Sequence, residues 1–293
     1  MYILETSKED LDLAREEIKS ISNSEIYQEK NLFEAECEFT RLTYLNRAFE
    51  TIDEIPKCDT FKIVEVNIKK KDIFDLVEDV KNKGSKVDLE KPQKIFTKIK
   101  FKEKIYLCEQ IYKNKKEFRL RNPKSRPGFH PGACKPDFAK VMINLSGVKR
   151  GNTILDPFCG TGGILIEAGF MNIKAKGSDI DQKMLSLTKL NLEHYKLKAD
   201  LEKKNALEIN SKVDAIVTEI PFGTTTKIIA ENIQDLINKF IQNIITKEIT
   251  NTIVIGVPNK IKFDFRPFKI KFKHEVYIHK SLSKIIYILK LND

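Results

Sequence analysis

The spacing of apolar positions predicts an α+β arrangement in the first part of the chain. Residues 8–22 place leucine, alanine and isoleucine at helical spacing among charges, and residues 73–82 repeat that period before Lys83 and Gly84. Strand-like apolar runs occupy 32–39 and 62–68. Residues 95–101 then alternate apolar side chains with lysine and are followed by a short turn and a second strand, which predicts a hairpin with one solvated, cationic face.

From residue 137 onward, helical and strand-like periods alternate in the order typical of an α/β domain. The expected helices are 137–147, 162–171, 181–195 and 228–246. The expected strands are 152–156, 174–179, 201–205, 213–218, 252–257, 268–278 and 284–289. Seven strands fit one mixed sheet, and a chain of 293 residues is long enough for two domains.

Charge changes sign along the chain. Residues 1–90, the acidic end, hold 14 lysine and arginine residues against 22 aspartate and glutamate residues. Residues 91–125, the basic belt, hold 12 against 3, and residues 126–293 hold 26 against 17. This pattern favours a polyanionic partner, with a merely solvated lysine surface as the alternative.

Cysteine spacing and hydropathy exclude several other classes. The five cysteines are scattered and include no Cys-x-x-Cys pair, so we expect reduced thiols and no metal site. No run of about 18 apolar residues and no signal-peptide pattern occurs, which predicts a soluble, cytoplasmic protein with no membrane partner.

The most informative segment is 153–168, an apolar run ending in Asp156 that is followed by Gly160, Thr161, Gly162 and a helix-like stretch. This order predicts a strand, a tight ligand-facing turn and a helix N-terminus. A dinucleotide fingerprint has no acid before its glycines. An acid at this point suits a ligand with a cationic amino-acid part. The alternative interpretation of the segment is a glycine turn in some other kind of α/β enzyme.

Asp-Pro-Phe-Cys-Gly-Thr-Gly-Gly at 156–163 resembles motif I of class I S-adenosylmethionine (SAM) methyltransferases, in particular the RNA guanine-N2 methyltransferases that carry a THUMP domain. Val-Asp-Leu-Glu-Lys-Pro at 87–92 is similar to the late part of a THUMP domain, and 278–289 resembles the closing segment of the tRNA guanosine-10 group. The resemblance implies a Rossmann-like, seven-stranded class I methyltransferase domain preceded by a smaller α+β THUMP-like region. The expected bounds are 1–54 for a small N-terminal domain, 55–122 for the THUMP-like domain, 123–136 for a linker and 137–293 for the methyltransferase domain.

Ligand-binding groups of a parallel sheet gather at the carboxyl ends of its strands. By resemblance, Asp179 there binds the SAM ribose, with helix capping as its alternative role, and Asn205 stands where the family has an aspartate for the adenine amine. His130 is more typical of a structural hydrogen bond than of a general base. The residues that we expect to bind SAM are Phe129, His130, Asp156, Gly160, Thr161, Gly162, Asp179, Ile180, Asn205 and Ala206.

Glu219, Ile220, Pro221 and Phe222 stand where amino-group methyltransferases carry Asp/Asn-Pro-Pro-Tyr/Phe. The resemblance implies that Glu219 and the Ile220 carbonyl accept hydrogen bonds from the target amine, while Phe222 stacks on a flipped base. The longer glutamate and the missing first proline leave two alternatives. Either the site has adapted by a compensating shift, or transfer has weakened or lapsed.

The resemblance therefore implies methyl transfer from SAM to the N2 amine of a guanosine in tRNA, at position 10. It allows a small activating subunit as a second partner. The alternatives are a tRNA-binding homologue without activity and an amino methyltransferase that acts on another nucleic-acid site. The residues expected to hold the RNA backbone are Lys98, Lys100, Lys102, Arg119, Arg121 and Arg126.

Overall fold

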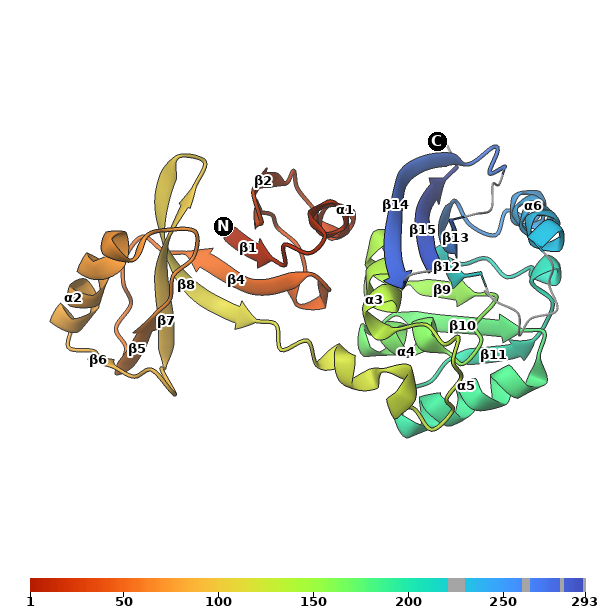
Figure 1. Cartoon of the computed structure of the whole chain (residues 1–293), viewed down its shortest axis with the longest axis horizontal. Coiled ribbons are helices and arrows are strands. Elements are labelled where there is room, and N and C mark those ends of the chain that lie inside the picture. Colours follow the sequence, from red (N-terminus) through yellow and green to blue (C-terminus); the bar gives the residue numbers. More distant parts are fainter. Residues whose placement is uncertain (221–229, 260–263, 280–281, 292–293) are drawn as a thin grey trace. The chain divides into compact units, whose positions relative to one another are not determined.

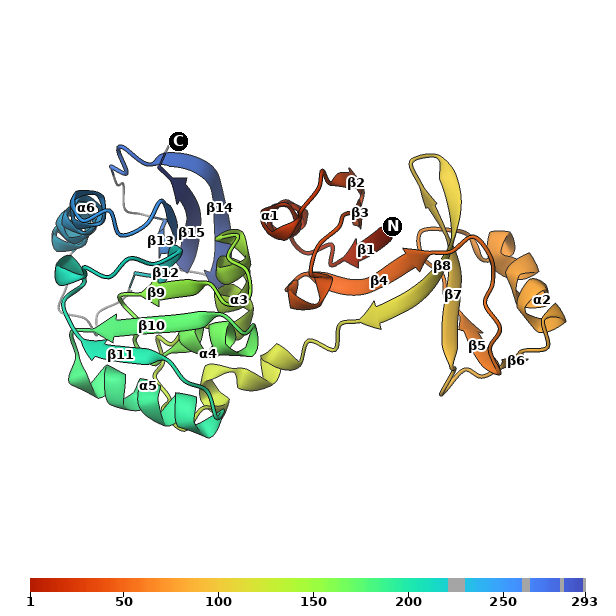
Figure 2. The same cartoon turned by 180° about the vertical axis from the view of Figure 1, so that it is seen from behind.

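The computed structural model describes residues 1–220, 230–259, 264–279 and 282–291. The chain divides into two compact units, Met1–Lys115 and Lys116–Asp293. Figures 1 and 2 show the elements of each unit from opposite sides.

The first unit is built on one eight-stranded sheet with the order β2-β3-β1-β4-β8-β7-β5-β6. Its elements are β1 (Tyr2–Thr6), α1 (Leu11–Ile21), β2 (Tyr27–Glu29), β3 (Leu32–Glu34), β4 (Leu45–Thr51), β5 (Thr60–Ile63), α2 (Phe74–Asn82), β6 (Lys86–Val87), β7 (Lys94–Phe101) and β8 (Lys104–Lys113). Only the β6-β5-β7 end is parallel. The two predicted helices and the lysine-rich hairpin are confirmed, whereas β1, β2, β4 and β6 were not predicted.

Each helix of this unit covers its own end of the sheet (Figure 1). Ile18 of α1 packs with Leu4 and Phe33 in one apolar cluster, and Leu76 of α2 packs with Phe61 in another. Because β4 and β8 pair between these ends, the sheet is continuous across the predicted boundary at residue 54. The division of this region into two domains stays a prediction.

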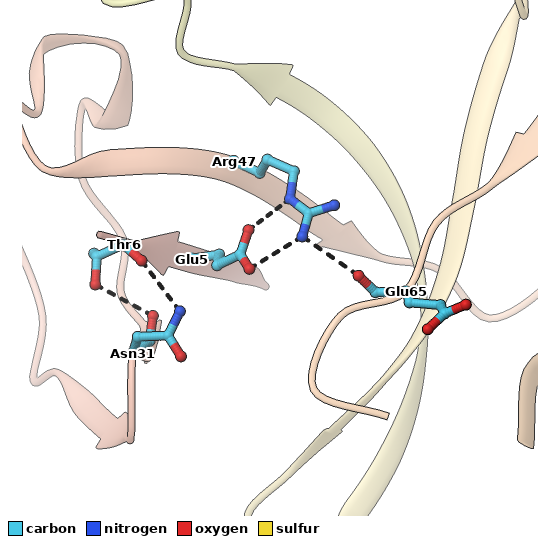
Figure 3. Close-up of polar contacts among 5 residues, drawn as sticks. All are labelled: Glu5, Thr6, Asn31, Arg47 and Glu65. Carbon is cyan, nitrogen blue, oxygen red and sulfur yellow. Dashed lines mark hydrogen bonds and ion pairs between the residues drawn. The ribbon is translucent and has the colours of Figure 1, made fainter. Parts of the chain in front are cut away.

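A polar cluster fixes the centre of the sheet (Figure 3). Arg47 of β4 lies opposite Glu5 of β1 and donates to both of its carboxylate oxygens, at 2.5 and 3.0 Å, and Arg47 also donates to the Glu65 carbonyl at 3.4 Å. Beside a bulge in β1, the Asn31 amide donates to the Thr6 carbonyl at 3.1 Å and the Thr6 hydroxyl donates to the Asn31 carbonyl at 3.3 Å. These bonds tie the segments after β2 and after β5 to the central strands.

The second unit contains a seven-stranded mixed sheet, as the sequence predicts, and the strand order is β11-β10-β9-β12-β13-β15-β14. Its elements are α3 (Pro136–Leu145), β9 (Thr153–Asp156), α4 (Gly163–Phe170), β10 (Lys174–Asp179), α5 (Gln182–His194), β11 (Asp200–Lys203), β12 (Ala215–Glu219), α6 (Ala230–Thr246), β13 (Thr252–Pro258), β14 (Lys269–His279) and β15 (Leu282–Lys290). Strands β9 to β13 are parallel, and β15 runs antiparallel to both β13 and β14. The strand order reverses between β9 and β12, which is where doubly wound sheets bind their ligands.

Apolar packing holds the strands that meet at this reversal. Ile237, Phe240 and Ile244 of α6 form one cluster with Ile216 of β12 and Ile255 of β13. Helix α3 contacts α4, β12 and β13. Helices α3 and α6 therefore both pack against β12 and β13.

Candidate active site

Three carboxylates lie at the carboxyl ends of neighbouring parallel strands. Asp156 ends β9, Asp179 ends β10 and Glu219 ends β12, and β9 pairs with both of the other strands. Because parallel strands finish at the same edge of the sheet, the three side chains belong to one edge. Among the described residues, no cluster of histidine, cysteine, aspartate and glutamate side chains could hold a metal ion.

The glycine turn between β9 and α4 is shaped by two left-handed residues, Gly160 at φ 52° and Gly162 at φ 81°. A Cβ on Gly162 would lie 2.8 Å from Cγ2 of Thr188, so both the backbone and the space require glycine. Thr188 of α5 donates from its hydroxyl to the Gly160 carbonyl at 2.7 Å. The turn is thus fastened to α5.

Asp156 is 2% exposed, and its Oδ1 accepts hydrogen bonds from the Thr218 hydroxyl at 2.6 Å and from the Phe158 amide at 3.2 Å. Burial raises the pKa of Asp156 to about 7, while these two hydrogen bonds lower it. Thr218 belongs to β12, so its bond joins the ends of β9 and β12.

Asp179 accepts two backbone hydrogen bonds, one from Gly160 and one from Asp181, both at 2.9 Å. Partial burial raises its pKa above the usual value. The helix cap of α5 is Asp181, which accepts from the Lys183 amide at 2.8 Å. The neighbouring Ile180 is an exposed apolar side chain.

Asn205 caps a short 3-10 helix, Ala206–Glu208, because its Oδ1 accepts from the Leu207 amide at 3.0 Å. A side-chain amide oxygen has two lone pairs, so one is still available to a ligand. Ala206 is buried in the apolar cluster of α6.

The segment with Phe129 and His130 is attached to the glycine turn by Asn191 of α5. Asn191 is fully buried, accepts from the Gly128 amide at 2.7 Å, and donates to the carbonyls of Gly128 at 3.1 Å and Thr161 at 2.9 Å. Phe129 is exposed, and Nδ1 of His130 accepts from the Gly132 amide at 3.2 Å. Sequence reasoning missed Asn191, since a polar residue on a helix normally indicates a solvated face.

Two buried hydroxyls near the turn, those of Thr161 and Ser178, have no hydrogen-bond partner within the part of the chain that the structure describes. Buried polar groups are usually paired, and an unpaired one costs about 1–3 kcal/mol. Their place, beside Gly160 and Asp179, fits a polar ligand that completes their hydrogen bonds.

Glu219 is 12% exposed and forms an ion pair with the Lys284 ammonium of β15. Ile220 is buried, and its amide donates to the Gly256 carbonyl at 2.9 Å, a bond that a proline at this position would lack. Pro221 and Phe222 lie outside the described residues. No local pattern could have predicted the Lys284 contact, because the two residues meet only through strand pairing.

The lysines predicted to bind RNA differ in their surroundings. Lys100 is exposed, whereas Lys98 is paired with Asp75 of α2 and Lys102 with Glu34 of β3. Lys94, on the same strand as Lys98, is paired as well. The ion pairs are Lys94–Glu109 at 2.8 Å, Lys98–Asp75 at 2.7 Å and Lys102–Glu34 at 2.6 Å.

The three predicted arginines have different roles in the fold. Arg119 is exposed. Arg121 donates to both oxygens of the buried Glu167 carboxylate, at 2.8 and 2.6 Å. Arg126 is 3% exposed and donates to the carbonyls of Arg121 at 2.9 Å and Cys134 at 3.2 Å. The last two arginines tie the first residues of the second unit to α4 and to the segment before α3.

The fold of this chain is similar to that of several solved structures. The chain aligns with TrmN from Thermus thermophilus with a TM-score of 0.53 at 16% identity over 99% of both chains. It aligns with SMU.472, solved in complex with SAH, with a TM-score of 0.53 at 12% identity over 100% of this chain and 98% of that one. A seven-stranded sheet with a glycine turn and acidic strand ends is the architecture of class I SAM-dependent methyltransferases, and this chain has it.

Sequence comparisons give the family within that class. The family model described as RMKL-like, methyltransferase domain, matches residues 123–265, and a DNA methylase model matches residues 5–190. The chain is 36% identical over 216 residues to the tRNA (guanine(10)-N2)-dimethyltransferase of Methanothermobacter thermautotrophicus, which covers 71% of this chain and 64% of that protein. It is 39% identical over 166 residues to the "Probable tRNA (guanine(10)-N2)-dimethyltransferase" of Methanothermococcus thermolithotrophicus, over 53% of this chain and 98% of that sequence. The chain belongs to the tRNA (guanine-10-N2) methyltransferase family of archaeal type.

The chain spans 64% of the length of the Methanothermobacter protein and 60% of that of the Methanocaldococcus jannaschii relative, with which it shares 36% identity over 226 residues, or 71% of this chain. Within the described residues, no helix is both long enough and apolar enough to cross a membrane.

Proposed function

We propose that this protein transfers the methyl group of SAM to the N2 amine of guanosine 10 in tRNA. One observation carries the proposal: Asp156, Asp179 and Glu219 end neighbouring strands around a glycine turn in a chain 36% identical to tRNA (guanine(10)-N2)-dimethyltransferases. A tRNA substrate implies a cytoplasmic protein, and a small activating subunit remains part of the proposal as a second partner.

In this proposal, SAM supplies an activated methyl group, and the chain's residues hold it in place. Asp179 accepts from the ribose hydroxyls, and Asp156 stabilises the cationic methionine end, where Phe129 and His130 also lie. SAM would offer hydrogen-bond partners to the hydroxyls of Thr161 and Ser178, which have none among the described residues. Gly160 and Gly162 allow close approach of the backbone, and Ile180, Asn205 and Ala206 form the adenine side.

The substrate amine is held by Glu219 and by the carbonyl of Ile220, with Pro221 and Phe222 proposed to form the stacking surface. Two acceptors on one amine draw its lone pair toward the methyl group. Because the methyl leaves sulfur without needing a strong base, positioning and exclusion of water supply most of the rate enhancement. The buried Ile220 fixes its carbonyl through the bond from its own amide to Gly256.

For the RNA backbone, we propose direct contacts from Lys100 and Arg119, which are both exposed. Lys98 and Lys102 contribute only when phosphate replaces their carboxylate partners. Lys62 and Lys113 line an open hollow of about 420 Å³ on the same sheet and offer further cationic groups. Arg121 and Arg126 act through the linker that they hold rather than through phosphate contacts.

The test is to incubate the protein with an unmodified tRNA transcript and SAM, and to identify the digested nucleosides by mass spectrometry. N2-methylguanosine or its dimethyl form is expected, and a transcript with adenosine at position 10 should give none. Methylation that persists in the control transcript points to another guanosine. Absence of product with SAM and tRNA both bound favours a binding homologue or a missing subunit.

A further inference from the structure

The pairing of three strands brings a lysine from the end of the chain to the candidate acceptor of the target amine. Glu219 lies opposite Gly256 in the parallel β12–β13 pair, and Lys284 lies opposite Pro258 in the antiparallel β13–β15 pair. Lys284 therefore reaches across the end of β13, and its ammonium contacts Oε1 of Glu219. Both side chains are largely buried, at 14% and 12% exposure, which separates this pair from the exposed surface pairs of the chain.

The surroundings of Lys284 are largely apolar on one side. Its ammonium lies 5.5 Å from the ring centroid of the buried Phe138, within the range of a cation–π contact. A Cβ on Gly256 would lie 3.1 Å from Cζ of Phe138, so the bare backbone of β13 leaves room for that ring. Burial lowers the pKa of Lys284. The neighbouring Cys134 raises this pKa, whereas the charge of Lys135 lowers it.

An unpaired ammonium that is only 14% exposed would be costly, and the carboxylate of Glu219 supplies its partner. Glu219 also depends on Lys284, because a glutamate side chain has one more rotatable bond than an aspartate side chain and its carboxylate is less fixed. A fixed ammonium removes that freedom.

We propose that Lys284 is a positioning residue for methyl transfer, an inference that rests on the proposed function. Lys284 holds Oε1 of Glu219 so that Oε2 accepts a hydrogen bond from the target amine. A carboxylate that pairs with an ammonium forms a stronger hydrogen bond to the amine than a neutral acceptor would. The ion pair also fixes where the Glu219 carboxylate lies. This compensates for the extra length of glutamate compared with the aspartate that the family carries at this position. Lys284 does not touch the reacting atoms and acts through Glu219.

A double-mutant cycle separates this role from a purely structural one. Lys284→Met and Lys284→Arg are made in the native chain, and Lys284→Met is also combined with Glu219→Gln. Lys290→Met is the matched control, because Lys290 lies at the opposite end of β15 and donates to the Thr252 hydroxyl at 2.8 Å. Single-turnover rate with tRNA at saturating SAM, SAM affinity and thermal melting are measured for each protein.

We expect Lys284→Met to lower the transfer rate about 10- to 100-fold, the range that misplacement by about 1 Å produces, with SAM affinity changed less than about threefold. Lys284→Arg should retain the rate within about fivefold. In the Glu219→Gln background, Lys284→Met should lower the rate by less than about twofold more, and Lys290→Met should match the native chain. If Lys284→Met melts below the assay temperature, Lys284→Gln replaces it.

Equal rate losses from Lys284→Met in both backgrounds, or a native rate in that variant, would overturn the inference while leaving the proposed function intact. No methylated nucleoside from the native chain, with SAM bound, is a different result. It would refute the proposed function, and the role of Lys284 in transfer would fall with it.

Discussion

Replacing Asp156 with asparagine should stabilise the ligand-free protein above neutral pH while weakening SAM binding. Burial raises the pKa of Asp156 from 3.8 to about 7 in the folded state. A raised folded pKa gives stability that is fully present below the unfolded pKa and is lost as the pH rises through 7. The shift of about 3 pKa units corresponds to about 4 kcal/mol in total, of which about 3 kcal/mol is lost between pH 5 and pH 8.

Asparagine keeps an oxygen that accepts from Thr218 and Phe158 but carries no proton that titrates in this range. The free energy of unfolding of Asp156→Asn, minus that of the native chain, should therefore rise by about 3 kcal/mol between pH 5 and pH 8. Adding SAM should reduce this pH dependence, because its ammonium favours the ionised carboxylate.

Hydrogen exchange of peptides from 153–179, measured at pH 5, 6, 7 and 8 at constant ionic strength, reports the stability of this unit separately from the other. The intrinsic exchange rate cancels between variants at each pH. Asp214→Asn is the control, since Asp214 is an exposed acid that accepts from the Thr153 amide at 2.7 Å. Parallel pH curves for the native chain and Asp156→Asn would refute the reasoning.

Three further outcomes are expected from the contacts around the site. Arg121→Met leaves the buried Glu167 unpaired and should cost about 3–5 kcal/mol in urea unfolding, much of it recovered when Glu167→Gln is added; additive losses would contradict this. Asn191→Ala removes three buried hydrogen bonds and should lower stability by about 3 kcal/mol in the same assay, whereas Leu190→Ala, on an exposed face of α5, should change it little. Asp179→Ala should weaken SAM binding at least about tenfold by calorimetry, and an unchanged affinity would remove Asp179 from the proposed ribose site.

The sequence predicted the motif-bearing half of the sheet well because its signals are local. Each strand of 153–179 ends in an acid beside a turn, so Asp156 and Asp179 could be placed at strand ends without knowing the topology. The short strands β2 and β6 have only three and two residues, too few for a hydrophobic period to emerge. The lysine-rich hairpin was predictable because apolar and cationic residues alternate within one run.

Contacts between distant segments could not be predicted in the same way. Glu219 and Lys284 are brought together by two strand pairings of opposite direction, and neither residue is part of a pattern that identifies the other. Thr188 and Asn191 follow the polar spacing of a solvated helix face, yet both are buried against the glycine turn. Tertiary hydrogen bonding, rather than local preference, decides their surroundings.

The paired lysines of the first unit have a consequence for counterions. Their charge is matched by carboxylates, two of them from the acidic end of the chain, so Lys94, Lys98 and Lys102 have little need of dissolved anions. Each phosphate contact by an unpaired cation contributes about 0.7–0.9 to the slope of log affinity against log salt. The basic belt should therefore give a shallower slope of log affinity against log salt with RNA than its 12 basic residues suggest.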